Sequence, residues 1–442
     1  MPAAFLKHPF MSQRAVAECD DDAMVNAMLA FELALAEVQE TSGAVPAGVS
    51  QQMREQLESA TFNVADIAEG IASGGNAAIP FVKQSRALLA DEIKRYWHQG
   101  ATSQDVVDSA LMLLLKPRLA ALDDLLLRCR SAAVALMDTH IDTPMVGRTL
   151  MQQALPIVFG VKVAHWAIGL EQTRRRLSAV ELPVQFGGAV GVHSGWDNLG
   201  LEWMDALAER LGLSVPVLPW HTDRYPIHVL GTALDAVAGA AEKIALDVSL
   251  LTQTEVGEVA EPSAPGMGES SSMPHKRNPV RSALIRGAAR QVHGHTSVLI
   301  NAAAQPLERG LGEWHAEWAP LMEGVLLVEG ALEQVVVLLE GLEVYPDNMW
   351  RNLAATGGGI MAEPAARLLA PTLGVEKAKA VSAEAAETSR REARPYSEVL
   401  AEHPDVKGAV DPDALRNACD PALYLGSSAA QITRVKKWLE AQ

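Results

Sequence analysis

The chain has 442 residues, of which 49% are apolar and 21% charged, so it can fill a large core and suits two or three domains. Its formal net charge of -17 at pH 7 argues against binding to nucleic acid or to an anionic membrane surface. Its three cysteines lie far apart and form no Cys-x-x-Cys pair, which argues against a disulfide framework and against a zinc site.

The sequence has no signal-peptide core near its start and no apolar run of about 18 residues, the length that a membrane span needs. We therefore expect a cytoplasmic protein without a membrane segment. Aromatic residues make up only 5% of the chain while Ala and Leu dominate, which favours helices over sheets.

Apolar residues spaced alternately by three and four positions predict long helices packed in a bundle. In chain order, this pattern predicts helices over residues 111–137, with a kink at Pro117, and over 157–168. The clearest pattern covers 230–251, and a further one covers 321–342. No alternation typical of strands is comparably strong.

Pro320 lies just before the last of these helices, at a position where a helix start tolerates proline. The long helices are apolar around much of their circumference. A monomer would leave much of that surface in water, so we expect an oligomer.

Breaks in the helical pattern suggest three domains. Residues 262–279 are rich in Pro, Gly and Ser and are predicted to form a loop, and Thr-Gly-Gly-Gly at 356–359 predicts a hinge. We therefore expect an N-terminal helical domain in residues 1–110, a central long-helix domain in 111–355, and a C-terminal helical domain in 356–442.

The predicted loop contains the run Glu-Ser-Ser-Ser-Met-Pro-His-Lys-Arg-Asn-Pro. Such a loop can close over an anion and exclude water. Lys276 and Arg277 would lower the pKa of a nearby serine or stabilise an oxyanion. The alternative is a solvated basic turn in which Asn278 caps a helix, and composition alone favours that alternative.

A second polar run, His-Gln-Gly-Ala-Thr-Ser-Gln-Asp, covers residues 98–105. Thr102 or Ser103 followed by an acidic residue is typical of a helix N-cap. A helix N-terminus with free N–H groups and hydroxyls is also a natural site for a carboxylate.

The serine-rich loop resembles the fumarase/aspartase superfamily signature Gly-Ser-Ser-x-Met-Pro-x-Lys-x-Asn. The resemblance implies that Ser270 transfers the proton on the carbon next to a carboxylate, and that Lys276 and Asn278 hold this carboxylate as it gains charge. Ser271 becomes a candidate substrate-binding residue. Glu269 departs from the signature glycine, and if that position needs a positive φ, Glu would strain the loop.

The run at 98–105 resembles the first conserved region of the same superfamily. The resemblance implies that Thr102 and Ser103 bind a substrate carboxylate, with His98 close by.

A third stretch, Gly-Arg-Thr-Leu-Met-Gln at 147–152, differs from most eliminating members, which have Arg-Thr-His and use the His as general acid. Leu150 replaces it and cannot move a proton. The lactonising members, the 3-carboxy-cis,cis-muconate cycloisomerases, also lack this His, because their substrate supplies a carboxylate nucleophile that needs no protonation. Arg148 and Gln152 are candidate substrate-binding residues here.

Further stretches look like the carboxymuconate cycloisomerases; they cover residues 185–189, 220–224, 253–259, 308–318 and 424–426. From them, His221, Arg224 and Arg309 become candidate substrate-binding residues. A structural role is a strong alternative for Arg224, and an ion pair with Glu308 is the alternative for Arg309.

The resemblance implies an all-α, fumarase/aspartase-like fold and a homotetramer whose central bundle pools long helices from four chains, with each active site drawn from three subunits. It implies a small di- or tricarboxylate substrate, a lactone-forming reaction, and neither a cofactor nor a metal. Two alternatives stay open: an elimination lyase acting on a substituted succinate, such as adenylosuccinate or nitrosuccinate, and a protein that keeps the fold without catalysis.

Overall fold

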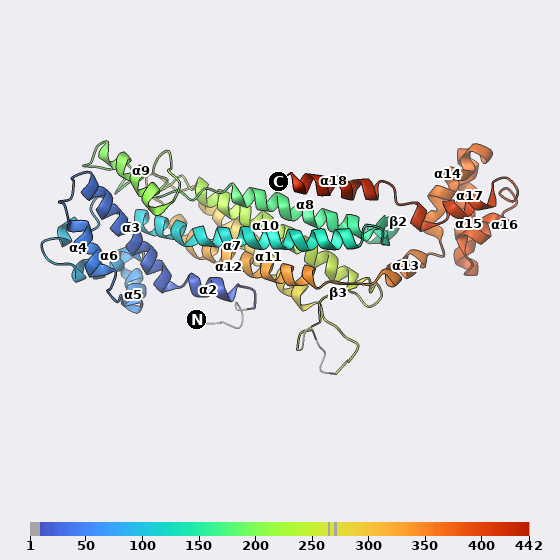
Figure 1. Cartoon of the computed structure of the whole chain (residues 1–442), viewed down its shortest axis with the longest axis horizontal. Helices are drawn as coiled ribbons and strands as arrows, with labels where there is room; N and C mark the ends of the chain where they lie inside the picture. The colour runs from blue at the N-terminus through green and yellow to red at the C-terminus, as the bar shows by residue number, and fades with distance from the viewer. Residues whose placement is uncertain (1–8, 264–265, 269–271, 442) are drawn as a thin grey trace. The chain divides into compact units, whose positions relative to one another are not determined.

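The computed structural model describes residues 9–263, 266–268 and 272–441. The described residues are mostly helical, with only short strands, so the all-α prediction is confirmed (Figure 1). The chain forms two compact units. The first unit comprises the residues up to Leu126 together with Thr173–Ala241 and Leu284–Glu333, and the second unit comprises Leu127–Gln172, Glu242–Ala283 and the residues from Gln334 onward.

The N-terminal part of the first unit is a group of helices in which α4, α5 and α9 pack against α3, and α6 packs against α4 and α5. The Asp20 side chain accepts a hydrogen bond from the Ala23 N–H, which caps α3, and acidic residues in the first turn suit the helix dipole. These helices are α2 (Gln13–Glu18), α3 (Asp21–Thr41), α4 (Val49–Leu57), α5 (Val64–Gly74), α6 (Ala78–Leu88) and α9 (Leu199–Leu211).

Five helices are long, and four of them contain or overlap the predicted apolar patterns, whereas α11 was not predicted. They are α7 (Ser103–Thr139), α8 (Phe159–Ser178), α10 (Tyr225–Leu251), α11 (Val280–Ala302) and α12 (Glu313–Glu340). The helix predicted over 111–137 lies within α7, with Pro117 inside it. Along α10, every position of the predicted pattern from Leu230 to Leu251 is buried. No helix in the described residues is both long and apolar enough to cross a membrane.

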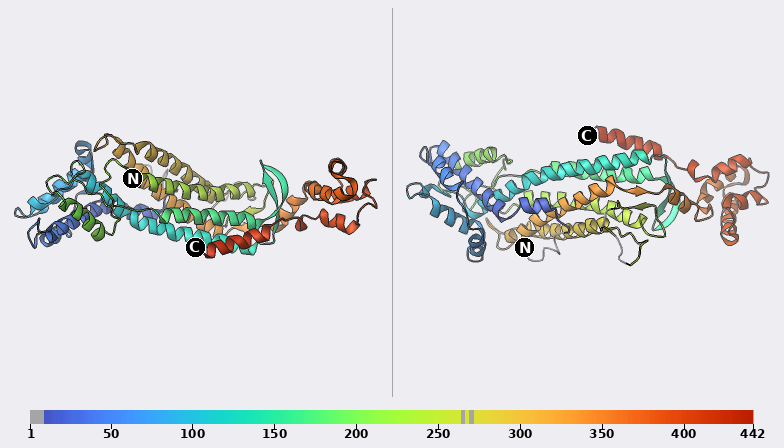
Figure 2. Two further views of the ribbon diagram at one scale, coloured as in Figure 1. Left: turned by 90° about the horizontal axis from the view of Figure 1, so that it is seen from above. Right: turned by 60° about the horizontal axis from the view of Figure 1, so that its bottom comes forward.

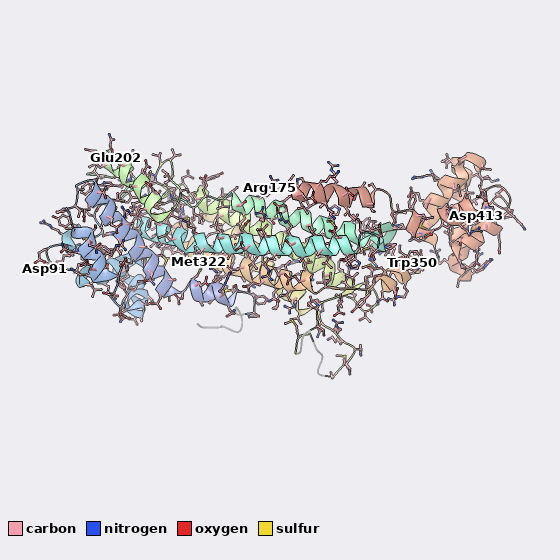
Figure 3. The ribbon with its side chains drawn as sticks, viewed as in Figure 1. Asp91, Arg175, Glu202, Met322, Trp350 and Asp413 are labelled. Atoms are coloured by element: carbon pink, nitrogen blue, oxygen red, sulfur yellow. The ribbon has the colours of Figure 1, made fainter. Side chains whose placement is uncertain are left out.

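The start of the last long helix was predicted wrongly. α12 begins at Glu313, and Pro320 lies inside it. The helix starts after Gly312, whose φ of 109° favours glycine and whose carbonyl accepts a hydrogen bond from the Ala316 N–H at 3.0 Å. Pro320 removes one later hydrogen bond without ending the helix, because the preceding turn is already formed. Figure 3 labels Met322 just beyond this position.

The hairpin in the second unit was not predicted. Strands β1 (Pro144–Thr149) and β2 (Gln152–Val158) pair antiparallel, so Ile157 belongs to β2, and α8 begins only at Phe159 (Figure 2). The pairing shifts register between Val146 and Arg148, and this irregularity disrupts the alternation that would have indicated strands.

The second unit also contains the helices and short strands of the C-terminal region. The elements are β3 (Val259–Ala260), β4 (Glu343–Val344), α13 (Pro346–Ala354), α14 (Ala362–Leu373), α15 (Val375–Glu392), α16 (Tyr396–Glu402), α17 (Pro412–Ala418) and α18 (Ser428–Glu440). Helices α14 to α17 share one core, which includes Leu369, Val381 and Leu400. Trp350, labelled in Figure 3, is half-exposed on α13. The three-domain division and the hinge stay predictions.

Candidate active site

The N-terminus of α7 carries the candidate residues Thr102 and Ser103. The Thr102 carbonyl accepts a hydrogen bond from the Val106 N–H, and the Thr102 N–H donates to Asp105 Oδ2 at 2.9 Å. Thr102 is therefore the N-cap residue, with Ser103 as the first helical residue, as the capping pattern suggested. Both side chains are partly exposed, and first-turn N–H groups have no acceptor within their own helix. This helix end can bind a carboxylate.

Arg309 lies beside Thr102. Its guanidinium donates to the Thr102 hydroxyl at 3.2 Å, to the Ala189 carbonyl at 2.8 Å and to the Gly188 carbonyl at 3.4 Å. All three acceptors are neutral, and Arg309 forms no ion pair within the described residues, with Glu308 or otherwise. Its positive charge is therefore available to an anion next to the α7 N-terminus.

A buried carboxylate, Asp105, holds this cluster together. Its two oxygens accept from the Gly187 N–H at 3.1 Å, from the Gly188 N–H and the Thr102 N–H at 2.9 Å each, and from His221 Nε2 at 2.6 Å. Sequence reasoning did not single out Asp105 as a site residue. The signal was its position three residues after Thr102, where a capping side chain reaches back to the N-cap.

His221 therefore belongs to the same cluster as Thr102 and Arg309. Its ring is buried, and the Gln104 side chain fixes its backbone by donating to its carbonyl at 2.8 Å. Because Nε2 faces Asp105, Nδ1 lies on the other side of the ring, on the side of Gly191.

His98 precedes the α7 N-terminus in a left-handed conformation, with φ at 61°. Its Nδ1 lies 2.5 Å from Oε1 of Glu32, a side chain of α3 without solvent exposure. Burial lowers the pKa of His98, but the charge and hydrogen bond of Glu32 raise it more, so the pKa lies above its ordinary value.

Arg224 does not join this cluster as a free cation. It is almost completely buried, and its guanidinium binds Asp108 at 2.7 Å and Glu317 at 2.7 Å. The Trp220 ring lies against the same guanidinium, 4.6 Å from centroid to Cζ. These contacts support a structural role for Arg224 rather than substrate binding.

In the second unit, Arg148 is also paired. On β1 it makes a two-pronged ion pair with the buried Glu258, at 2.9 and 2.7 Å, and the Asn352 amide donates to the same carboxylate at 2.8 Å. This pairing leaves Arg148 with less free charge than Arg309 has. Gln152 lies at the start of β2 and is exposed.

The turn of the hairpin consists of Leu150 and Met151. Both have positive φ, 49° and 65°, and both side chains project into solvent, with Leu150 97% exposed. Two bulky apolar residues in left-handed conformations are unusual for a tight turn, which favours Asn and Gly. The exposed tip offers no group that can transfer a proton.

The serine-rich loop lies in the second unit, but Glu269, Ser270 and Ser271 fall outside the described residues. Residues on either side of these three are described. The Asn278 N–H donates to the Gly268 carbonyl at 2.9 Å, and this hydrogen bond joins the two flanks of the loop. Lys276 is exposed and forms no ion pair within the described residues.

A cavity of about 920 Å³ adjoins this loop, and Lys276 and Asn278 line it together with Ser249, Thr252 and Asn348. Arg277 also lines the cavity, but its guanidinium forms an ion pair with Glu343 at 2.7 Å, so Lys276 is the loop cation without an acidic partner in the described residues. Asn278 does not cap α11. Glu261 takes that role by accepting from the Arg281 and Ser282 N–H groups at 2.9 and 2.7 Å.

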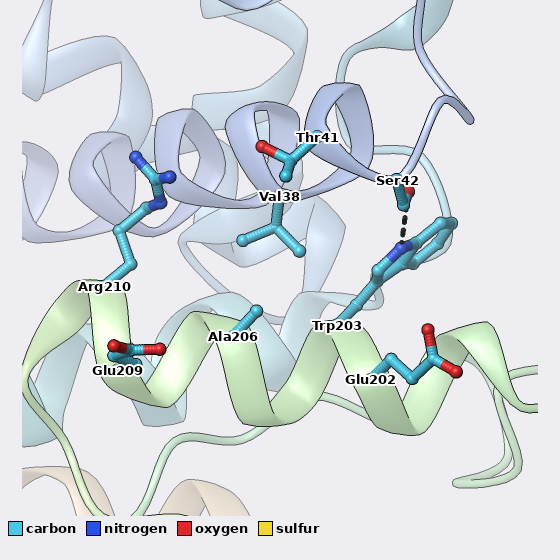
Figure 4. Close-up of a pocket in the computed structure, with 8 residues that line it drawn as sticks. All are labelled: Val38, Thr41, Ser42, Glu202, Trp203, Ala206, Glu209 and Arg210. Carbon is cyan, nitrogen blue, oxygen red and sulfur yellow. Dashed lines mark hydrogen bonds between the residues drawn. The ribbon is translucent and has the colours of Figure 1, made fainter.

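Another cavity, of about 560 Å³, lies between α3 and α9 and contains none of the candidate residues (Figure 4). Trp203 closes one side by donating to the Ser42 hydroxyl at 2.9 Å. The Arg210 of its lining is already paired with Glu37. This cavity therefore has no free cation for a carboxylate substrate.

Comparison with known proteins places the chain in a family. A family model described as "Lyase" matches residues 9–294, which is more than half of the chain. The chain belongs to this lyase family. Membership of the fumarase/aspartase superfamily, predicted from the loop signature, is thereby confirmed.

Three members of the lyase family resemble the chain over nearly its whole length. A 3-carboxy-cis,cis-muconate cycloisomerase of Bradyrhizobium diazoefficiens is 41% identical, covering 98% of this chain and 97% of that protein. A nitrosuccinate lyase of Streptomyces davaonensis is 39% identical, covering 95% and 91%. The crystal structure of the 3-carboxy-cis,cis-muconate lactonizing enzyme of Pseudomonas putida superposes with a TM-score of 0.94, at 37% identity and 99% coverage of both chains.

Within the lyase-family fold, the predicted site residues form two groups. The first unit brings together Thr102, Ser103, His221 and Arg309, and His98 lies just ahead of them. The second unit holds Lys276 and Asn278 at one cavity. The candidates that are paired or outside the described residues are Arg224, Arg148, Ser270 and Ser271.

Proposed function

We propose that this lyase-family chain is a 3-carboxy-cis,cis-muconate cycloisomerase. The observation that carries the proposal is Leu150 at the hairpin tip, where eliminating relatives would need a proton-donating His. Relatives with the cycloisomerase name are 41% identical to the chain over nearly its full length. The enzyme would act in protocatechuate catabolism.

The reaction closes a lactone within one molecule. An oxygen of one terminal carboxylate forms a bond to an alkene carbon, and the π electrons move toward the neighbouring carbon, which then takes a proton. The charge that develops next to the activating carboxylate is the main barrier, and Lys276 and Asn278 are the groups proposed to stabilise it. Ser270 is proposed to transfer the proton.

Substrate positioning falls to the cations and donors of the first unit. We assign one carboxylate to Thr102, Ser103 and the α7 N-terminus, and another to Arg309, because Arg309 is the cation there without an acidic partner in the described part of the chain. His98 and His221 border the same group. Since nucleophile and alkene belong to one molecule, correct positioning supplies much of the rate acceleration.

The assembly that we propose is a homotetramer of 47.2 kDa chains, acting in the cytoplasm, whose active sites draw on three subunits. Support comes from apolar side chains that stay partly exposed on the long helices, namely Leu246, Val298, Ile300 and Val337. An oligomer would bury them. Sedimentation at several protein concentrations tests this stoichiometry.

The test of function is the loss of diene absorbance when 3-carboxy-cis,cis-muconate is added. Ser270→Ala should abolish turnover, whereas Ser272→Ala, the third serine of the run and outside the signature pair, should retain it. Turnover that survives Ser270→Ala would contradict the assigned proton transfer. A native protein without any turnover would contradict the substrate.

The second candidate is a β-elimination lyase that releases fumarate from a substituted succinate. The 39% identity to a nitrosuccinate lyase favours nitrite as the leaving group, because an anion of low pKa also needs no general acid. Fumarate release from nitrosuccinate, in the absence of muconate turnover, would select this candidate. A chain inactive on both substrate classes would support the non-catalytic alternative.

A further inference from the structure

Glu32 is a buried carboxylate that the proposed reaction does not use. It lies on α3, its side chain has no solvent exposure, and its Oε1 is 2.5 Å from His98 Nδ1. Its second oxygen, Oε2, is buried without a hydrogen-bond partner. Among the described residues, His98 is the charged partner of Glu32. A buried carboxylate with an unpaired oxygen is costly, so its location beside the site needs an explanation.

The same face of α3 holds the residue after His98. Gln39, two helical turns beyond Glu32, donates to the Gln99 carbonyl at 2.7 Å. His98 itself adopts a left-handed backbone conformation, with φ at 61°, which persists only where the surroundings enforce it. Two buried polar side chains of one helix therefore fix the segment that leads into Thr102 and the α7 N-terminus.

The orientation of the His98 ring follows from the contact with Glu32. Because Nδ1 faces Glu32, the second nitrogen, Nε2, is left without a hydrogen-bond partner in the described part of the chain. The His98 side chain is 22% exposed, whereas Glu32 is fully enclosed. The partly exposed His98 ring can thus be reached by a ligand, whereas the carboxylate of Glu32 cannot.

Three charged groups from different helices act on His98. Glu32 of α3 and Asp105 of α7 favour its protonated form, and Arg86 of α6 opposes it. Burial also opposes protonation, and the combined effect raises the pKa of His98 above the ordinary value. Asp105 already accepts four hydrogen bonds, so Glu32 is the carboxylate in direct contact with the ring.

We infer that Glu32 is a positioning residue that holds His98 in a single orientation as an imidazolium, so that its Nε2–H binds a carboxylate of the substrate. The inference rests on the proposed function for the identity of that carboxylate. Protonated His98 is then a second cation beside Arg309 and Thr102. Glu32 keeps His98 charged without touching the substrate.

The first experiment follows the protonation of His98 without needing turnover. Hydrogen–deuterium exchange at the histidine Cε1 position, read by mass spectrometry across a pH series, gives the titration of each histidine in the full-length protein. Glu32→Gln keeps the shape and removes the charge, so the His98 titration should move to lower pH. Glu37→Gln is the matched control, because Glu37 lies on the same helix but pairs with Arg54 and Arg210. It should leave His98 unchanged.

The second experiment measures KM and kcat against pH with 3-carboxy-cis,cis-muconate. His98 binds the anion only when protonated, and its pKa is raised, so KM of the native enzyme should stay low below this raised pKa and increase as the pH passes above it and the proton is lost. In Glu32→Gln this rise should occur at lower pH. At a pH between the two transitions, the variant should therefore show a KM raised about tenfold, with kcat much less affected.

His98→Asn keeps the inference testable if Glu32→Gln fails to fold, because Asn tolerates the left-handed conformation. It should abolish the pH dependence of KM in this range. A His98 titration unchanged by Glu32→Gln would overturn the inference, as would a KM profile unchanged by His98→Asn. If the muconate is not turned over at all, the proposed function fails, while the exchange experiment still decides whether Glu32 holds His98 protonated.

Discussion

Arg309 donates a hydrogen bond to the Thr102 hydroxyl at 3.2 Å, although 207 residues separate them in the chain. The other acceptors of this guanidinium are the carbonyls of Gly188 and Ala189. A cation held in place by neutral groups keeps its charge for a ligand, whereas Arg224 and Arg148 give theirs to carboxylates of the protein. Arg309 can therefore bind a ligand, whereas Arg224 and Arg148 stabilise the fold.

Replacing Arg309 by Gln should raise KM for the tricarboxylate by roughly ten- to a hundredfold, because one charge-assisted contact to the substrate, worth about 1.5–3 kcal/mol, is lost. Steady-state kinetics measure this change. Arg210→Gln is the control, since Arg210 is paired with Glu37 in the same unit and should leave KM unchanged. Equal effects of the two substitutions would argue against a substrate contact for Arg309.

Asp105→Asn should lower both stability and activity. The amide replaces one acceptor oxygen by a donor, so at least one of its four hydrogen bonds is lost in a buried site, at a cost of about 1–3 kcal/mol. Urea unfolding measures the loss. Asp91→Asn, on an exposed carboxylate paired with Lys94, should leave the free energy of unfolding nearly unchanged.

Arg224→Met should destabilise the protein by about 3–5 kcal/mol at neutral pH, because Asp108 and Glu317 are left buried without a cation. Burial already raises the pKa of Glu317, so it takes up a proton readily as the pH falls, and the deficit should narrow toward about pH 5. Denaturant unfolding at both pH values tests the sign. Arg128→Met, which breaks an exposed pair with Glu340, should cost at most about 1 kcal/mol.

Leu150→His restores the residue that most eliminating relatives carry at the hairpin tip. If lactone closure uses a carboxylate nucleophile, a proton donor there has no leaving group to serve. kcat should then change by far less than the roughly hundredfold that a general acid contributes. A gain of that size in muconate turnover would show that a proton transfer at this position limits the native reaction.

The long helices could be predicted because their burial is encoded in regular spacing. All the pattern positions of α10 are buried, and the same holds along α12 as far as its last turn. The hairpin could not be predicted in this way, because a register shift next to Gly147 breaks the alternation, and Leu150 and Met151 lack the usual chemistry of a tight turn. The β1–β2 hairpin therefore depends on pairing between its strands, which the local sequence preference does not indicate.

For the candidate site, motif resemblance identified residues but not their partners. Thr102 and Arg309 were named from stretches far apart in sequence, and the fold brings them together. Glu32 was missed because a single Glu within the apolar stretch 27–36 has no distinguishing pattern. Whether Arg224 is a free cation depends on Asp108 of α7 and Glu317 of α12, and only the fold shows that pairing.

The hydrogen bonds of Asp105 also determine when, during synthesis, the chain can first bind its substrate. Asp105 emerges from the ribosome early, yet its partner His221 lies 116 residues later, and Arg309 follows 207 residues after Thr102. Until those segments are made, the carboxylate and the α7 N-terminus lack the contacts that fix them, and loop closure over such distances is slow. A nascent or truncated chain should therefore have no affinity for a tricarboxylate, so binding reports on completed folding.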